Sequence, residues 1–203
     1  AVLKDADFHV GRLLKFLSEM GLDENTLIIF SSDNGPAGWG PSKEAGSTAG
    51  LKGRKVDIFQ GGVTVPFIVK WKNHVHENKV DSTSVLSTVD LLPTFASLAQ
   101  IQLPEDYYLD GENIASILKN NPIKRIKPLF WEWRFPKVKT NHWAQGAVRH
   151  GDWKLLFNAD INRNELYNIS KDPFEKNNIA ENKKQIISEL KGLWNDWKKE
   201  LPK

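Results

Sequence analysis

Hydrophobic and polar positions follow two different periods in the first part of the chain. Residues 2–20 carry apolar side chains at helical spacing, and Gly21 follows them as a C-terminal cap. Residues 27–30 form a continuous apolar run rich in β-branched and aromatic side chains, which is typical of a strand buried between helices in a parallel sheet. A helix, a tight loop and a buried strand make half of a right-handed crossover unit. The pattern therefore predicts an α/β fold.

The middle of the chain continues this pattern after a long interruption. Residues 35–62 are punctuated by glycines, and a loop of this length inside a compact domain is usually functional or disordered. Residues 63–71 contain a second short apolar strand, and residues 87–98 open a helix for which Thr88 or Asp90 is the expected N-cap. The predicted order is therefore strand, long loop, strand and helix.

The last third of the chain has a different character. Residues 128–135 alternate like a strand with one buried face, and further short strands are expected at 144–149, 153–158 and 165–167. Turn signals separate these strands, which predicts an antiparallel meander. Residues 182–199 carry apolar side chains at helical spacing, so we expect one helix to lie on this small sheet.

The composition of the chain narrows the classes of function that it can have. A formal net charge of +3, without a run of five or more like charges, argues against a nucleic-acid partner. No apolar stretch reaches the roughly 18 residues of a membrane span. The chain has no cysteine, which excludes disulfides, thiolate metal sites and a cysteine nucleophile within it. It begins without methionine inside a running helical pattern, from which we expect a piece of a longer protein.

Two polar side chains end the first predicted strand. Asp33 and Asn34 follow it directly, and Gly35 begins a turn. In open α/β sheets, ligands bind outside the carboxyl ends of strands. A carboxylate and an amide oxygen are hard donors that suit Ca²⁺ or Mg²⁺. The same residues also fit plain turn chemistry, so both interpretations stay open on this segment alone.

A basic segment lies in the second half of the long loop. Lys52, Arg54 and Lys55 place three cations within four residues, and Gly53 lets the backbone approach a ligand closely. This arrangement fits an anion-binding loop. A solvated basic loop is the alternative.

In order and spacing, several segments resemble the C-terminal half of a type I sulfatase, the formylglycine-dependent arylsulfatase and carbohydrate sulfatase family of the alkaline phosphatase superfamily. Residues 25–35 resemble the strand that carries two metal ligands, and residues 51–66 resemble the second signature, in which a lysine precedes Gly-Gly-Val and a proline. Residues 87–94, 149–155 and 165–175 resemble further segments of that family in the same order. The resemblance covers essentially the whole chain.

The resemblance implies a fold and its division into domains. Residues 1–125 would be the C-terminal portion of the large α/β sandwich domain, which is alkaline-phosphatase-like and carries the metal- and sulfate-binding loops. Residues 126–203 would be a C-terminal subdomain, built from a small antiparallel sheet and one packed terminal helix.

The resemblance also assigns roles to individual positions. Asp33 and Asn34 match the two later ligands of the family's Ca²⁺ site, and Lys55 matches the catalytic lysine that binds the sulfate group. Two positions depart from the pattern. Gln60 stands where a glutamate is common and Thr64 where an arginine is common, which puts loop packing and substrate preference in doubt but leaves the lysine untouched.

The family's nucleophile is a formylglycine made from the first residue of a Cys/Ser-x-Pro-x-Arg motif. That motif does not occur in these 203 residues, and neither do the two early aspartates that complete the metal site. We therefore expect this chain to be inactive alone, with the N-terminal half of the same enzyme as its partner. The resemblance implies a sulfated small molecule or glycan as substrate and a periplasmic or extracellular location.

The aromatic-rich segment of the last third holds three candidate substrate-binding residues, Glu132, Arg134 and His142. A position at the rim or surface is the alternative for each. Two other functions also stay open. The first is a phosphatase or phosphonate hydrolase of the same superfamily, which commonly adds histidine metal ligands. The second is a non-catalytic carbohydrate-binding fragment, which would bind glycans without a metal.

Overall fold

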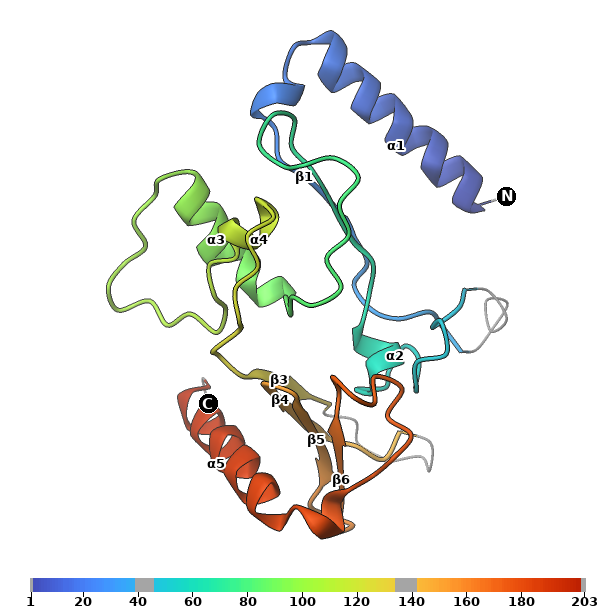
Figure 1. Ribbon diagram of the computed structural model, residues 1–203, viewed down its shortest axis with the longest axis vertical. Coiled ribbons are helices and arrows are strands. Elements are labelled where there is room, and N and C mark those ends of the chain that lie inside the picture. Colours follow the sequence, from blue (N-terminus) through green and yellow to red (C-terminus); the bar gives the residue numbers. More distant parts are fainter. Residues whose placement is uncertain (1, 39–45, 134–141, 202–203) are drawn as a thin grey trace.

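The computed structural model describes residues 2–38, 46–133 and 142–201 of the chain (Figure 1). The N-terminal helix and a two-stranded ribbon lie at one end of the molecule, and a four-stranded sheet with the C-terminal helix lies at the other (Figure 1). The helices and strands are α1 (Val2–Glu19), β1 (Ile28–Ser31), α2 (Gln60–Val63), β2 (Phe67–Lys70), α3 (Leu91–Leu98), α4 (Ala115–Leu118), β3 (Leu129–Glu132), β4 (Gly146–His150), β5 (Trp153–Asn158), β6 (Arg163–Asn168) and α5 (Lys184–Glu200). Short 3-10 turns cover Asp23–Asn25, Thr88–Asp90 and Ala180–Asn182.

The C-terminal sheet is the predicted antiparallel meander, with strand order β3-β4-β5-β6. Because successive side chains of a strand point to opposite faces, each strand contributes to two separate cores. On one face, Val148, Leu155 and Leu166 pack against Leu190 and Trp194 of α5. The expected terminal helix on the small sheet is therefore confirmed.

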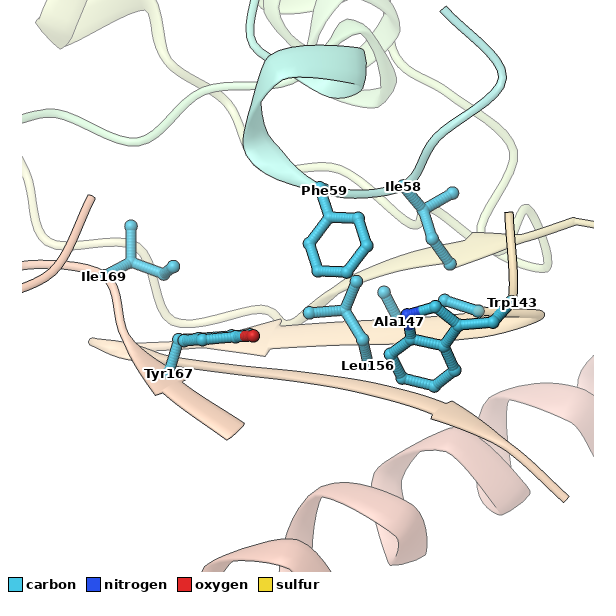
Figure 2. Close-up of a cluster of buried hydrophobic side chains, with 8 residues drawn as sticks. Ile58, Phe59, Trp143, Ala147, Leu156, Tyr167 and Ile169 are labelled. Carbon is cyan, nitrogen blue, oxygen red and sulfur yellow. The ribbon is translucent and has the colours of Figure 1, made fainter. Parts of the chain in front are cut away.

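The opposite face of this sheet receives a segment from far earlier in the chain. Ile58 and Phe59 immediately precede α2. They pack against Leu156 and Tyr167, with Trp143 beside them (Figure 2). All five side chains are at most 6% exposed. The long glycine-rich loop is thus anchored on the C-terminal sheet rather than disordered in its second half.

The expectation of a parallel, buried sheet around residues 27–30 is wrong for this chain. β1 pairs with β2 in antiparallel register, so that Ile29 faces Val69. Phe30 is 52% and Ile68 is 58% exposed, and α1 contains no buried residue. A continuous apolar run indicates that both faces of a strand need cover. It does not specify which strand pairs with it, or that the cover lies in the same 203 residues.

The helix expected from residue 87 is present as a 3-10 turn followed by α3. Asp90 precedes α3, as one of the two alternatives predicted, but its side chain does not cap that helix. Its two carboxylate oxygens accept the N–H groups of Ser87 and Glu112, and Oδ2 also pairs with Arg125 Nη1 at 2.6 Å. Thr88 lies inside the turn. Among the described residues, no helix is both long and apolar enough to cross a membrane.

Candidate anion and metal site

The turn after β1 is held against a pair of glycines at the start of α2. Gly35 donates its N–H to the carbonyl of Gly62 at 2.8 Å. A Cβ built on Gly35 would lie 1.9 Å from the carbonyl oxygen of Gly61, so any side chain there would push the two segments apart. Glycine at this position therefore fixes Asp33 and Asn34 next to α2.

The basic loop crosses the same glycine pair. Lys55 donates its N–H to the carbonyl of Pro36 at 3.0 Å, and Gly61 donates to the carbonyl of Lys52 at 2.6 Å. A Cβ on Gly62 would lie 2.0 Å from the carbonyl oxygen of Asp57. Only glycines allow this approach of three backbone segments. The predicted metal ligands and the predicted anion-binding lysine are thereby brought to one place.

These residues border a cleft of about 1330 Å³. Asp33, Asn34 and Lys55 lie on its lining, and the sheet contributes Trp131 and Arg149 to the same cleft. A cleft that combines hard oxygen donors, a cation and half-buried aromatic rings is suited to a polar anionic ligand with an apolar or sugar-like body.

Asp33 and Asn34 offer oxygen atoms suited to a hard cation. Asp33 Oδ1 accepts the N–H of Asn34 at 3.0 Å, which fixes the carboxylate. The Asn34 amide donates Nδ2–H to the carbonyl of Gly35 at 3.0 Å, so its Oδ1 is available as a ligand. Ca²⁺ takes about 6–8 oxygen ligands. The described residues contain no group of three or more His, Asp or Glu side chains that fits a metal, so Asp33 and Asn34 would supply only part of a Ca²⁺ site.

Lys55 is the cation of the loop whose charge is free for a ligand. In the described part of the chain it has no ion-pair partner, whereas Lys52 Nζ lies 3.2 Å from Glu165 Oε2 and donates to Tyr167 Oη at 2.9 Å. Burial favours the neutral form of Glu165, but hydrogen bonds from Tyr167 and Arg163 outweigh it and lower the pKa of this carboxyl. Lys52 therefore ties the loop to β6.

The backbone directly after Lys55 is strained. Val56 has φ of 74°, in the left-handed region that β-branched residues rarely adopt. Such conformations cost on the order of 1–3 kcal/mol and persist only where the surroundings enforce them. Gly53, with φ of 82°, begins the same turn, and a Cβ there would lie 2.9 Å from the Asp57 and Phe59 Cβ atoms.

A cluster of three buried polar residues, called here the Lys154 cluster, joins α2 to the sheet and comprises Gln60, Lys154 and Glu175. Glu175 Oε2 accepts the backbone N–H of Gln60 at 2.7 Å, and Lys154 Nζ donates to Gln60 Oε1 at 3.1 Å. The two charged groups lie 3.0 Å apart and are fully buried. Burial lowers the pKa of Lys154 to about 8 and raises that of Glu175.

The Lys154 cluster also explains the departure at position 60. A glutamate there would place a second carboxylate beside Glu175, whereas the Gln60 amide oxygen accepts from Lys154 without adding charge. Sequence reasoning did not assign a role to Lys154 or Glu175. The only signal was that both lie in segments that resemble the sulfatase pattern, at 149–155 and 165–175.

The three predicted substrate-binding residues have different surroundings. Glu132 borders the cleft, and its Oε1 accepts from Lys198 of α5 at 2.8 Å. Arg134 lies outside the described residues. His142 Nδ1 lies 2.6 Å from Asp57 Oδ1, so this histidine meets the loop that carries the candidate lysine. Whether any of them binds substrate stays a prediction.

Comparisons with known proteins agree on one family. Residues 54–200 match the family described as N-sulphoglucosamine sulphohydrolase, C-terminal, and residues 1–101 match the family described as Sulfatase. A sulfatase of Formosa agariphila is 34% identical over 201 residues, which cover 91% of this chain and 35% of that protein. An N-acetylgalactosamine-6-O-sulfatase of Bacteroides thetaiotaomicron is 29% identical over 214 residues, which cover 95% of this chain and 40% of that protein.

Solved structures give the same picture and confirm the expected fold class. The crystal structure of Ps i-CgsB in complex with k-i-k-neocarrahexaose superposes with a TM-score of 0.79 at 29% identity, over 94% of this chain and 40% of that chain. The chain thus spans between 35% and 40% of the length of these three proteins.

Proposed function

This chain belongs to the sulfatase family, as its motifs predicted, and we propose that the complete protein of which it forms a part hydrolyses sulfate esters of a sulfated glycan. The observation that carries the proposal is the crossing at Gly61 and Gly62. It brings Asp33 and Asn34, at the start of the long loop, and Lys55, in its second half, to one cleft.

In this proposal Asp33 and Asn34 are two ligands of a Ca²⁺ ion, and a bound Ca²⁺ would polarise the sulfate oxygens. The remaining ligands and the formylglycine nucleophile come from the N-terminal half of the same enzyme. Lys55 places a compact positive charge against the sulfate group, where it stabilises negative charge that gathers on the sulfate and on the departing alcohol oxygen.

The glycan preference is supported by the cleft and by the relatives. Trp131 and Trp133 border the cleft and are only partly buried, and such rings offer flat apolar faces against which a sugar can stack. One relative is named as an N-acetylgalactosamine-6-O-sulfatase, and one similar structure holds a neocarrahexaose. A glycan substrate also fits the periplasmic or extracellular location that the family suggests.

The test compares Lys55→Ala with Lys119→Ala in the complete protein. Lys119 is an exposed lysine outside the cleft lining, so its loss controls for general effects of removing a charge. We expect Lys55→Ala to lower kcat/KM for an aryl sulfate and for a sulfated disaccharide by about 100- to 1,000-fold. Removal of Ca²⁺ with a chelator should abolish turnover, and added Ca²⁺ should restore it.

Two outcomes would contradict the proposal. A loss below about tenfold in Lys55→Ala would remove the role of this lysine. A wild-type protein that hydrolyses the matching phosphate ester faster than the sulfate ester would point to the phosphatase alternative.

A further inference from the structure

We propose that the Asp57–His142 hydrogen bond holds the strained turn at Val56 and thereby orients Lys55, so that His142 is a positioning residue of the proposed sulfate site. The inference rests on the proposed function for the role of Lys55. The structural part of the inference, that the loop conformation depends on His142, is independent of the proposed function.

The turn itself is closed by Asp57. This residue donates its backbone N–H to the carbonyl of Arg54 at 2.8 Å, and its Oδ2 accepts the backbone N–H of Arg54 at 2.9 Å. Both hydrogen bonds join Arg54 to Asp57, so the turn that they close contains Lys55 and Val56. The left-handed conformation of Val56 therefore depends on the position of the Asp57 side chain.

The second oxygen of Asp57 faces His142. A carboxylate only accepts hydrogen bonds, so the proton of the 2.6 Å contact sits on His142 Nδ1, which donates to Asp57 Oδ1. Asp57 thus uses one oxygen to close the turn and the other to bind the C-terminal part of the chain. Withdrawing His142 would free the carboxylate to rotate and would leave the turn without its external support.

His142 is suited to this task because its neighbour is rigid. Trp143 is 5% exposed, and its ring lies edge-on to Phe59 with 6.2 Å between the ring centroids. The carbonyl of Trp143 accepts Nδ2–H of Asn158 on β5 at 2.6 Å. Trp143, which directly follows His142, is therefore fixed to the sheet (Figure 2), so the hydrogen bond from His142 to Asp57 transmits the position of the sheet to the loop.

The residues that line the cleft indicate that His142 acts by positioning the loop and not by direct contact with the substrate. Among the described residues, Lys55, Val56 and Asp57 border the cleft, whereas His142 does not. His142 contacts Asp57, which borders the cleft. Its effect on the reaction is therefore expected to pass through Asp57 and the turn, which distinguishes it from the substrate-binding role that the sequence suggested.

The experiment uses a double-mutant cycle in the complete protein. His142→Ala should lower kcat/KM about 10- to 100-fold, the size expected for loss of a charge-assisted hydrogen bond. The loss should be equal for a small aryl sulfate and for a sulfated oligosaccharide. His142→Asn, whose amide can donate from nearly the same place as Nδ1, should recover most of it. In a Val56→Gly background the turn carries no φ penalty, so the added loss from His142→Ala should shrink to below about threefold.

A second readout does not depend on turnover. Native-state trypsin cleavage after Arg54 and Lys55, followed by mass spectrometry, reports opening of the turn. His142→Ala should accelerate this cleavage about tenfold, and His142→Asn should not. If the wild-type protein hydrolyses no sulfate ester but His142→Ala still accelerates cleavage, the proposed function fails and the positioning role stands.

The opposite results would overturn the positioning role. Unchanged cleavage in His142→Ala means that the turn does not depend on His142. A loss of activity confined to KM for the oligosaccharide, and equal in the Val56 and Val56→Gly backgrounds, would identify His142 as a direct substrate contact instead.

Discussion

Replacing Glu175 by glutamine removes one charge from the Lys154 cluster while keeping its shape. The glutamine oxygen can still accept the N–H of Gln60, which Glu175 binds at 2.7 Å. Lys154, whose side chain is fully buried, loses its only carboxylate partner at ion-pair distance in the described residues. The perturbation therefore isolates the charge of the pair from its hydrogen bond and its packing.

Breaking a buried ion pair from one side costs about 3–5 kcal/mol, because the remaining charge stays buried without compensation. The pKa of Lys154 gives an independent measure of how strongly burial acts there. A value of about 8, in place of 10.5, corresponds to about 3 kcal/mol against the charged form even with Glu175 present. Glu175→Gln should therefore destabilise the folded chain by about 3 kcal/mol or more. The double variant Lys154→Met/Glu175→Gln should cost less than Glu175→Gln alone, because it leaves no buried charge.

The assay is unfolding of the complete protein, followed by tryptophan fluorescence in urea, for the wild type and the two variants. Six of the eight tryptophans of this chain lie between residues 131 and 197, so the contribution of this chain to the signal reports mainly on the C-terminal sheet and α5. We expect the order of stability to be wild type, double variant, Glu175→Gln. A Glu175→Gln variant within 1 kcal/mol of the wild type, or a double variant less stable than Glu175→Gln, would refute the reasoning.

Two further predictions concern the same region. Gly62→Ala should abolish turnover and raise the trypsin sensitivity of the loop, because its Cβ would lie 2.0 Å from the carbonyl oxygen of Asp57; activity within tenfold of the wild type would contradict this. Stability should also depend on pH through Lys154. Its folded pKa of about 8 lies below its ordinary 10.5, so between these values the unfolded chain binds a proton that the folded chain lacks, and Lys154 favours folding more as the pH rises. Urea unfolding at pH 7.5, 9 and 10 should show the wild type gaining stability relative to Lys154→Met/Glu175→Gln, and a constant difference would contradict it.

The parts of the fold that the sequence predicted well are those set by local patterns. The meander and α5 follow from period-two and helical spacing and from turns between neighbouring strands, all of which act over a few residues. The pairing of β1 was not predictable in this way. Its apolar run fits a buried strand in any sheet, and the antiparallel partner β2 lies beyond the long loop.

The site shows the same division between local and distant information. Asp33 and Asn34 were predicted as ligands because they follow a strand, and Lys55 because it precedes a glycine pair at a spacing that resembles a known motif. Their supporting residues were not. Lys154 alternates within β5 like an exposed lysine, and only the structure shows it buried against Glu175. His142 and Asp57 are 85 positions apart, so no local pattern connects them.

The anchoring of the basic loop on the C-terminal sheet has a consequence for biosynthesis. Glu175 binds the backbone of Gln60 across 115 positions, and Lys52 depends on Glu165 and Tyr167 in the same way. During translation, the segment around Lys55 leaves the ribosome long before the strands that will shape it. A nonsense mutation or frameshift after residue 160 would leave Asp33, Asn34 and Lys55 intact in the polypeptide, yet the loop would lose Glu165, Tyr167 and Glu175, which hold it on the sheet. Inactivating lesions in a gene that encodes this chain are therefore expected to extend well downstream of Lys55, the last residue proposed to touch sulfate.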